Sequence, residues 1–136
     1  MIIKRKTRLK PRRSAPRKSG RKLWPEYLDA VRTLDCYACG RPGPSDPDHQ
    51  GPRPFGRKAD DDTAVPMCRT CHHYRTDGYV YGPFEVVIRG MPVAMRGWKR
   101  ADKERMRAWC SVAIAATQAV VYPMLGLAVP AEGANT

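Results

Sequence analysis

Aromatic residues are scarce in this sequence, and its first 25 positions contain no acidic residue. Aromatic side chains make up 8% of the 136 residues, so the core lacks many of the large side chains that stabilise small domains. A chain of this length forms about one domain, which excludes a multidomain machine. No apolar stretch follows the basic start, since Ile2 and Ile3 precede the charges. We therefore expect no signal peptide and a cytoplasmic protein.

Long uncharged runs are also rare, with one exception from Ala108 to Pro130. These 23 residues are long enough to span a bilayer. Their serine, threonine, glutamine and two prolines weaken that interpretation. The spacing of Trp109, Ala113, Ala116 and Val120 instead favours one apolar face of a packed helix.

Basic residues are concentrated at the N-terminus. The net charge is +12, and eleven of the 25 Lys and Arg residues precede residue 26, which leaves the rest of the chain almost neutral. The segment has too few apolar residues to fold, so we expect a disordered arm over residues 1–23. Such an arm suits a polyanion, with nucleic acid first and an acidic membrane surface second. Its predicted DNA-binding residues are Lys4, Arg5, Lys6, Arg8, Lys10, Arg12, Arg13, Arg17, Lys18, Arg21 and Lys22.

Four of the five cysteines form two Cys-x-x-Cys pairs. Cys36 and Cys39 make the first pair and Cys68 and Cys71 the second, with 28 residues between the pairs. Disulfides are not expected in the cytoplasm, and a thioredoxin-like redox pair needs a single motif in a βαβ unit. Two such knuckles can close a tetrahedron around one structural Zn²⁺, which in small peptides contributes an apparent ~10–16 kcal/mol. We expect Cys110 to be a small buried residue of the C-terminal helix.

The segment between the knuckles is too rich in proline and glycine for a core. We expect a strand, a loop and a strand from about Ser45 to Met67, then a helix from about Arg69 to Asp77 with Gly78 past its end. The knuckles would pin the two ends of this ββα unit together. His49, at the end of the first strand, would then face His72 in the first helical turn.

The histidines and aspartates in and beside this unit suit phosphodiester chemistry. Metal-dependent cleavage needs carboxylate or imidazole ligands, a base for the attacking water and cations for the phosphate. The segment contains each type. The alternative, on composition alone, is a solvated acidic loop with surface histidines.

A series of short motifs runs through residues 24–78. Cys36-Tyr37-Ala38-Cys39-Gly40 is followed by Asp48-His49-Gln50-Gly51-Pro52-Arg53, then by Gly56-Arg57-Lys58-Ala59-Asp60-Asp61, and last by Val65-Pro66-Met67-Cys68-Arg69-Thr70-Cys71-His72. In this order the segment resembles the HNH endonuclease superfamily. Its branch of small phage and prophage nucleases is the closer resemblance, and some of these are similar to the RecA-dependent nuclease Ref.

The resemblance implies an α+β fold, a zinc-stapled ββα-metal domain over residues 24–78. It implies that Asp48 and His72 bind a catalytic Mg²⁺ or Mn²⁺ and that His49 is the general base. The usual Asn position falls on Asp61, which would orient the His49 ring, with Asp62 as a near alternative.

The third ligand of the catalytic ion stays open. Many relatives have a histidine where this chain has Thr76, and His73 or Asp77 are the alternatives. Arg53, Arg57 and Lys58 would clamp neighbouring phosphates, or else they are solvated loop charges.

The function that the resemblance implies is a metal-dependent DNA endonuclease that leaves a 5′-phosphate and a 3′-hydroxyl. It would be phage-encoded and act in recombination, replication or packaging in the bacterial cytoplasm. Its partners would be DNA and a recombinase filament such as RecA or another phage protein. The alternative is a non-catalytic zinc-ribbon nucleic-acid-binding protein, which leaves Asp48, His49 and His72 unexplained. A zinc-dependent redox switch comes third.

The remaining segments are expected to support this domain. Pro25 to Val31 is predicted as a helix with Trp24 and Leu28 available for the core. Residues 79–136 are predicted as a strand and helix extension with a flexible C-terminus. Its strands are expected at 79–81, 84–88 and 93–95, and its helix from Lys99 to about Tyr122, with the apolar half packed on the strands or on a second copy.

Overall fold

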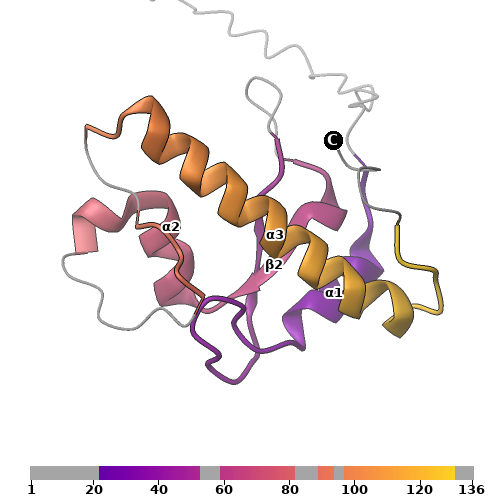
Figure 1. The fold of residues 1–136 in the computed structure, drawn as a ribbon. Helices are drawn as coiled ribbons and strands as arrows, with labels where there is room; N and C mark the ends of the chain where they lie inside the picture. The colour runs from indigo at the N-terminus through magenta and orange to yellow at the C-terminus, as the bar shows by residue number, and fades with distance from the viewer. Residues whose placement is uncertain (1–21, 53–58, 82–88, 94–96, 131–136) are drawn as a thin grey trace, which may run out of the picture.

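The computed structural model describes residues 22–52, 59–81, 89–93 and 97–130. Its elements in chain order are helix α1 (Pro25–Arg32), strand β1 (Asp46–His49), the 3-10 turn η1 (Asp61–Thr63), strand β2 (Ala64–Met67), helix α2 (Arg69–Tyr81) and helix α3 (Arg100–Met124). Helix α3 passes across β2 toward α1 (Figure 1). The described residues therefore form a small α+β fold in which a β-hairpin is followed by helices, as predicted.

Several predicted features lie outside the described residues. They are the arm up to residue 21, the strand at 84–88, most of the strand at 93–95 and the C-terminal residues 131–136. The same holds for Arg53, Arg57 and Lys58, which were predicted to contact phosphates.

Strands β1 and β2 form a two-stranded antiparallel sheet. Asp46 pairs with Met67, Asp48 with Val65, and His49 with Ala64. All four residues of β2 are buried, whereas Asp48 is the buried residue of β1. Asp48 and His49 are consecutive residues of β1 that contact different partners, His72 and Asp61. The predicted strands between Ser45 and Met67 are confirmed, although both are short.

Helix α1 starts as predicted, and Trp24 and Leu28 pack against the core as expected. Pro25 lies in the first turn, where the missing backbone N–H costs nothing. Tyr27 and Val31 are fully buried, while Trp24 and Leu28, which were predicted for the core, lie partly buried at its edge. The four-residue spacing of Tyr27 and Val31 places both side chains against β2 and the C-terminal half of α3.

Helix α2 is longer than predicted. It begins at Arg69 as expected, but it continues through Gly78 to Tyr81. The predicted strand at residues 79–81 is therefore wrong, and the predicted boundary after residue 78 falls inside a helix. An interior glycine costs about 1 kcal/mol relative to alanine, which weakens a helix without ending it.

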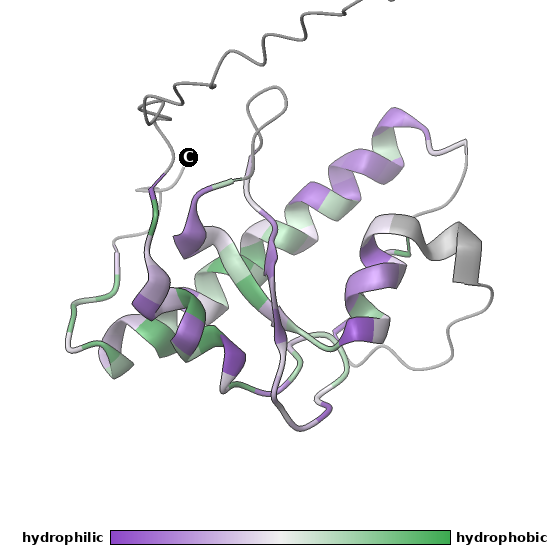
Figure 2. Cartoon of the chain, turned by 180° about the vertical axis from the view of Figure 1, so that it is seen from behind, coloured by the Kyte–Doolittle hydropathy of each residue, from purple (hydrophilic) through white to green (hydrophobic). Residues whose placement is uncertain are grey.

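Helix α3 follows the predicted range closely. Its first turn is closed by Asp102, whose carboxylate accepts the Lys99 backbone N–H at 3.0 Å. Figure 2 shows hydrophilic colouring on its N-terminal turns and more hydrophobic colouring beyond them. Cys110 is buried as predicted, but Val120, predicted on the apolar face, is 49% exposed. The buried face consists of Met106, Cys110, Ala113, Thr117, Gln118, Val121 and Tyr122.

The packing of α3 bears on the membrane alternative. Its middle and C-terminal residues contribute to both hydrophobic clusters of the fold. Among the described residues, none of the helices combines the length and the apolar character that crossing a bilayer requires.

Asp62 links η1 to two other parts of the chain. Its carboxylate oxygen Oδ2 accepts the Tyr122 hydroxyl at 3.2 Å and the Lys22 ammonium at 3.3 Å. Its backbone carbonyl accepts the Gln118 side-chain amide at 2.8 Å. Burial, and then the Asp62 charge, raise the pKa of Tyr122. These contacts hold η1, and with it Asp61, between the start of α1 and the end of α3.

Candidate functional site

The four cysteines of the two knuckles form one cluster. Their sulfur atoms all lie within 4.8 Å of one another, and the Sγ atoms of Cys39 and Cys68 are 3.8 Å apart. Sulfurs around a tetrahedral zinc with Zn–S bonds of 2.3 Å are separated by about 3.8 Å. The number, type and spacing of the donors therefore fit a structural Zn²⁺, and the predicted grouping of these cysteines is confirmed.

Backbone hydrogen bonds and a left-handed glycine form the turn of the first knuckle. Gly40 has a positive φ of 75°, and its backbone N–H donates to the Cys36 carbonyl at 2.8 Å. The Cys36 N–H in turn donates to the Arg41 carbonyl at 2.9 Å. A left-handed residue suits glycine because it has no Cβ. The tight turn aims the thiols of Cys36 and Cys39 at the second knuckle, in which the Cys71 N–H donates to Cys68 Sγ at 3.4 Å.

Contacts within the cluster shift the pKa values of its thiols in different directions. A hydrogen bond from Cys71 is the main cause that lowers the pKa of Cys36 to about 4. The same contact and burial raise the pKa of Cys71, and burial raises the pKa of Cys39. Because zinc binds thiolates, its binding releases the protons held by the sulfurs.

His49 and Asp61 lie in contact at one edge of the hairpin. His49 Nε2 is 2.8 Å from Asp61 Oδ1, and their side chains are 14% and 3% exposed. The other oxygen of Asp61 accepts the Trp24 backbone N–H at 2.8 Å, which fixes the carboxylate against the start of α1. The two aspartates considered for this position thus differ, because Asp61 contacts His49 whereas Asp62 contacts Tyr122.

Asp48 and His72 form a second imidazole–carboxylate contact beside the same hairpin. His72 Nε2 is 3.4 Å from Asp48 Oδ1, and the His72 side chain is 33% exposed while that of Asp48 is 2% exposed. A second carboxylate of β1, Asp46, lies 3.9 Å from His72 Nδ1. The first turn of α2 and alternate residues of β1 therefore bring imidazole and carboxylate groups together.

Arg75 holds the same Asp48 carboxylate. Its Nη2 donates to Asp48 Oδ1 at 2.6 Å, and its Nε donates to Oδ2. Burial lowers the pKa of Arg75, but the hydrogen bonds and charge of Asp48 outweigh burial and raise it. Gln50 Nε2 also donates to Asp48 Oδ2, at 3.1 Å. The carboxylate is therefore part of a buried ion pair.

The donors near Asp48 form an incomplete set for a second ion. Two ligands of one ion at about 2.1 Å lie about 3 Å apart, so Asp48 Oδ1 and His72 Nε2 are close enough to share one. Gln50 Oε1 is buried and has no hydrogen-bond partner among the described residues, so it is an available oxygen. In the part of the chain that the structure describes, however, the four cysteines are the one cluster of three or more metal-ligating side chains.

For the third ligand, the structure describes the side chains of Thr76 and His73 but not that of Asp77. The Thr76 hydroxyl donates to the His72 carbonyl at 3.0 Å, so it serves the helix backbone. The His73 ring lies 6.2 Å from the His72 ring, and the Asp77 side chain is not among those described. Lys22, predicted as part of the arm, bonds to Asp60 through its backbone and to Asp62 through its ammonium group.

Three residues around Asp48 were not predicted as site residues, namely Arg75, Gln50 and Asp46. Two spacing signals point to them. Arg75 follows His72 by three residues, which places both on one face of α2. Gln50 and Asp46 are each two positions from Asp48, which is the repeat of one strand face.

Comparison with known proteins yields no family. The chain matches no protein-family model, and it has no significant match among curated proteins or solved structures. The described residues define a class of protein, a small α+β fold. It contains a cluster of four cysteines that could hold a metal ion, a β-hairpin and a following helix.

Proposed function

We propose that this protein is a metal-dependent endonuclease of the HNH type that hydrolyses DNA phosphodiesters. One observation carries the proposal, namely the two imidazole–carboxylate contacts on one hairpin. His49 meets Asp61 at 2.8 Å, and His72 meets Asp48 at 3.4 Å. One cysteine knuckle precedes this hairpin and the other follows it directly, so metal binding by the cysteines would hold its strands together.

His49 would be the general base. The Nε2 contact with the Asp61 carboxylate favours the tautomer that carries its proton on Nε2, since a carboxylate accepts. Nδ1 then keeps a lone pair that accepts a proton from the attacking water. Asp61 acts through His49 and is a positioning residue.

Asp48 and His72 would hold the catalytic Mg²⁺ or Mn²⁺, with Gln50 Oε1 as a further oxygen donor. When bound, such an ion stabilises the negative charge that develops on the phosphate and the leaving oxygen. The Arg75 guanidinium would have to break at least one hydrogen bond to Asp48 for the ion to bind, because the guanidinium and the ion would use the same carboxylate oxygens.

The substrate class rests on charge. The chain carries +12, and the eleven N-terminal cations suit a phosphate backbone rather than a small molecule. The second candidate is a non-catalytic zinc-containing nucleic-acid-binding protein. The bidentate Arg75–Asp48 pair favours this alternative, because it satisfies Asp48 without an ion.

Plasmid nicking by zinc-loaded protein tests the proposal. Cleavage is expected on addition of Mg²⁺ or Mn²⁺ and not in zinc alone, a comparison that avoids a chelator strong enough to strip the cysteines. His49→Ala should reduce cleavage by ~10²-fold or more while DNA binding and zinc content stay near those of the parent. A parent protein that binds DNA and never cuts it would support the second candidate. Unchanged cleavage by His49→Ala would refute the assignment of the base.

A further inference from the structure

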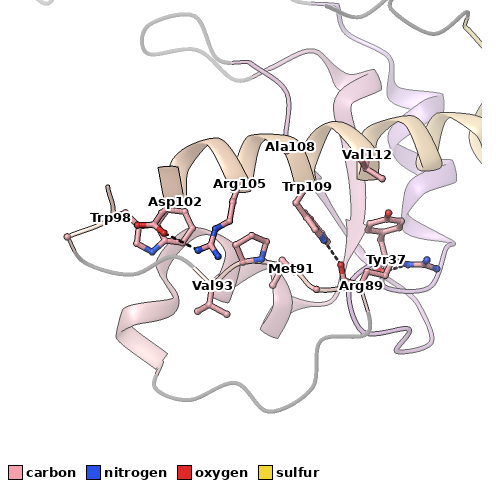
Figure 3. A pocket seen from close by; sticks show the side chains of 13 residues that line it. Tyr37, Arg89, Met91, Val93, Trp98, Asp102, Arg105, Ala108, Trp109 and Val112 are labelled. Atoms are coloured by element: carbon pink, nitrogen blue, oxygen red, sulfur yellow. Dashed lines mark hydrogen bonds and ion pairs between the residues drawn. The ribbon is translucent and has the colours of Figure 1, made fainter. Parts of the chain in front are cut away.

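An open groove runs along the N-terminal half of α3, against the described residues between Arg89 and Trp98 (Figure 3). Its volume is about 910 Å³, which is in the range of ligand-binding clefts. Two of the three tryptophans of the chain, Trp98 and Trp109, line it together with Tyr37. None of the residues of the candidate nuclease site contributes to its wall.

Internal contacts fix one end of the groove. Tyr37 and Trp109 meet edge to face with ring centroids 5.5 Å apart. The Trp109 indole N–H donates to the Arg89 carbonyl at 2.8 Å, and the Arg89 guanidinium lies 4.6 Å from the centre of the Tyr37 ring. Arg89 Nε also donates to the Tyr37 carbonyl at 2.7 Å. Because Tyr37 lies between Cys36 and Cys39, this end is built on the first knuckle.

Cations accompany the aromatic side chains. Arg89 and Arg105 line the groove with one acid, Asp102, and the Arg105 side chain remains 70% exposed despite its 3.0 Å contact with Asp102. The start of α3 carries further exposed basic residues, Lys99, Arg100 and Lys103, of which Arg100 pairs with Glu104. A ligand of complementary chemistry has flat aromatic faces and negative charges.

We propose that this groove binds unpaired nucleotides of a single-stranded nucleic acid. Bases stack on Trp98 and on the exposed part of the Tyr37–Trp109 pair, and Arg105 and Arg89 meet the phosphates. Stacking on aromatic side chains needs open base faces, which duplex DNA hides inside its own stack. The groove therefore distinguishes unpaired from paired strands, and its binding does not depend on cleavage.

The test is fluorescence anisotropy of a labelled oligothymidine titrated with the zinc-loaded full-length protein. Salt of about 0.3 M weakens the contribution of the N-terminal cations. The parent protein should bind the oligothymidine, and an unlabelled duplex of equal length should compete poorly. Trp98→Leu should weaken binding about tenfold, whereas Trp98→Phe keeps an aromatic face and should retain most of the affinity.

A matched pair of arginine variants tests the charge. Arg105 and Arg32 are both exposed helical arginines that pair with an aspartate three residues earlier. Arg105→Ala should weaken oligothymidine binding severalfold, and Arg32→Ala should leave it unchanged. Far-UV circular dichroism and zinc content establish that each variant is folded. If Trp98→Leu fails to fold, the arginine pair decides alone.

Three results would overturn the inference. One is equal affinity for the oligothymidine and the duplex. The second is retention of full affinity in both Trp98→Leu and Arg105→Ala. The third is displacement of the oligothymidine by an acidic peptide at lower concentration than by unlabelled oligothymidine, which would assign the groove to a protein partner.

Discussion

His49 Nε2 lies 2.8 Å from Asp61 Oδ1, and the second oxygen of the same carboxylate holds the Trp24 backbone N–H. One buried carboxylate thus orients the imidazole and anchors the start of α1. The contact joins positions 12 residues apart that belong to different elements, β1 and η1. It is the relationship on which the proposed tautomer of His49 depends.

Asp61→Asn should retain most of the cleavage rate, because its amide oxygen can still accept from His49. Asp61→Ala removes the acceptor and should slow single-turnover cleavage about 10- to 100-fold, the usual effect of removing a partner that orients a functional histidine. The asparagine variant lacks one of the two acceptors for Trp24 and His49 and the alanine variant lacks both, so their melting temperatures are measured alongside. Asp60→Ala is the control, since Asp60 accepts only the Lys22 backbone N–H among the side-chain bonds described. Equal rates for the asparagine and alanine variants would contradict a positioning role.

Elemental analysis should find close to one tightly bound zinc per chain, because the four sulfurs form a single cluster. Cys36→Ser should lose the zinc and most of the folded far-UV signal, since the cysteines belong to a core cluster and metal binding contributes folding free energy. Cys110→Ser is the matched control. It also replaces a buried sulfur with a hydroxyl, but it lies outside the cluster and should keep the zinc. A folded Cys36→Ser protein without zinc would disprove the structural role.

Arg75→Ala should destabilise the fold by about 3–5 kcal/mol, because it leaves the Asp48 carboxylate buried without its cation. Mn²⁺ should then raise the melting temperature of the variant more than that of the parent, since Asp48 Oδ1 loses its arginine partner and Oδ2 keeps only the Gln50 amide. Arg32→Ala removes an exposed ion pair and should cost no more than about 1 kcal/mol. Thermal unfolding with and without Mn²⁺ measures both effects. A variant that is destabilised yet indifferent to Mn²⁺ would count against Asp48 as a metal ligand.

Deletion of residues 2–21 should weaken binding to all duplexes by a similar factor, because lysine and arginine side chains on phosphates carry no sequence information. The slope of log affinity against log salt should become shallower by about 0.9 for each phosphate that the shortened protein no longer neutralises. The deletion stops before Lys22, since that residue bonds to Asp60 and Asp62. Cleavage at saturating DNA and low salt should persist.

Salt titrations on two unrelated duplexes separate the alternatives for the arm. A changed sequence preference after the deletion would indicate that the arm reads a groove. An unchanged slope on both duplexes would show that it does not contact phosphates.

Short-range spacing predicted the cysteine cluster and the hairpin well. Two residues between cysteines restrict both thiols to one turn. Each knuckle therefore presents two sulfurs together, and the four-cysteine cluster forms when the two knuckles pack side by side. The prolines and glycines between the knuckles likewise limited the strands to short segments. The concentration of positive charge near the N-terminus is a property of the sequence alone.

Only the tertiary structure decided which partner each polar side chain takes. Asp61 and Asp62 are adjacent, yet one meets His49 on β1 and the other meets Tyr122 on α3. The Asp48 carboxylate forms an ion pair with Arg75, 27 residues further along the chain. Gly78 predicted a helix end, but α2 continues to Tyr81. A sequence motif constrains dihedral angles over a few residues, whereas these contacts depend on how distant segments pack and on the requirement that buried polar groups be paired.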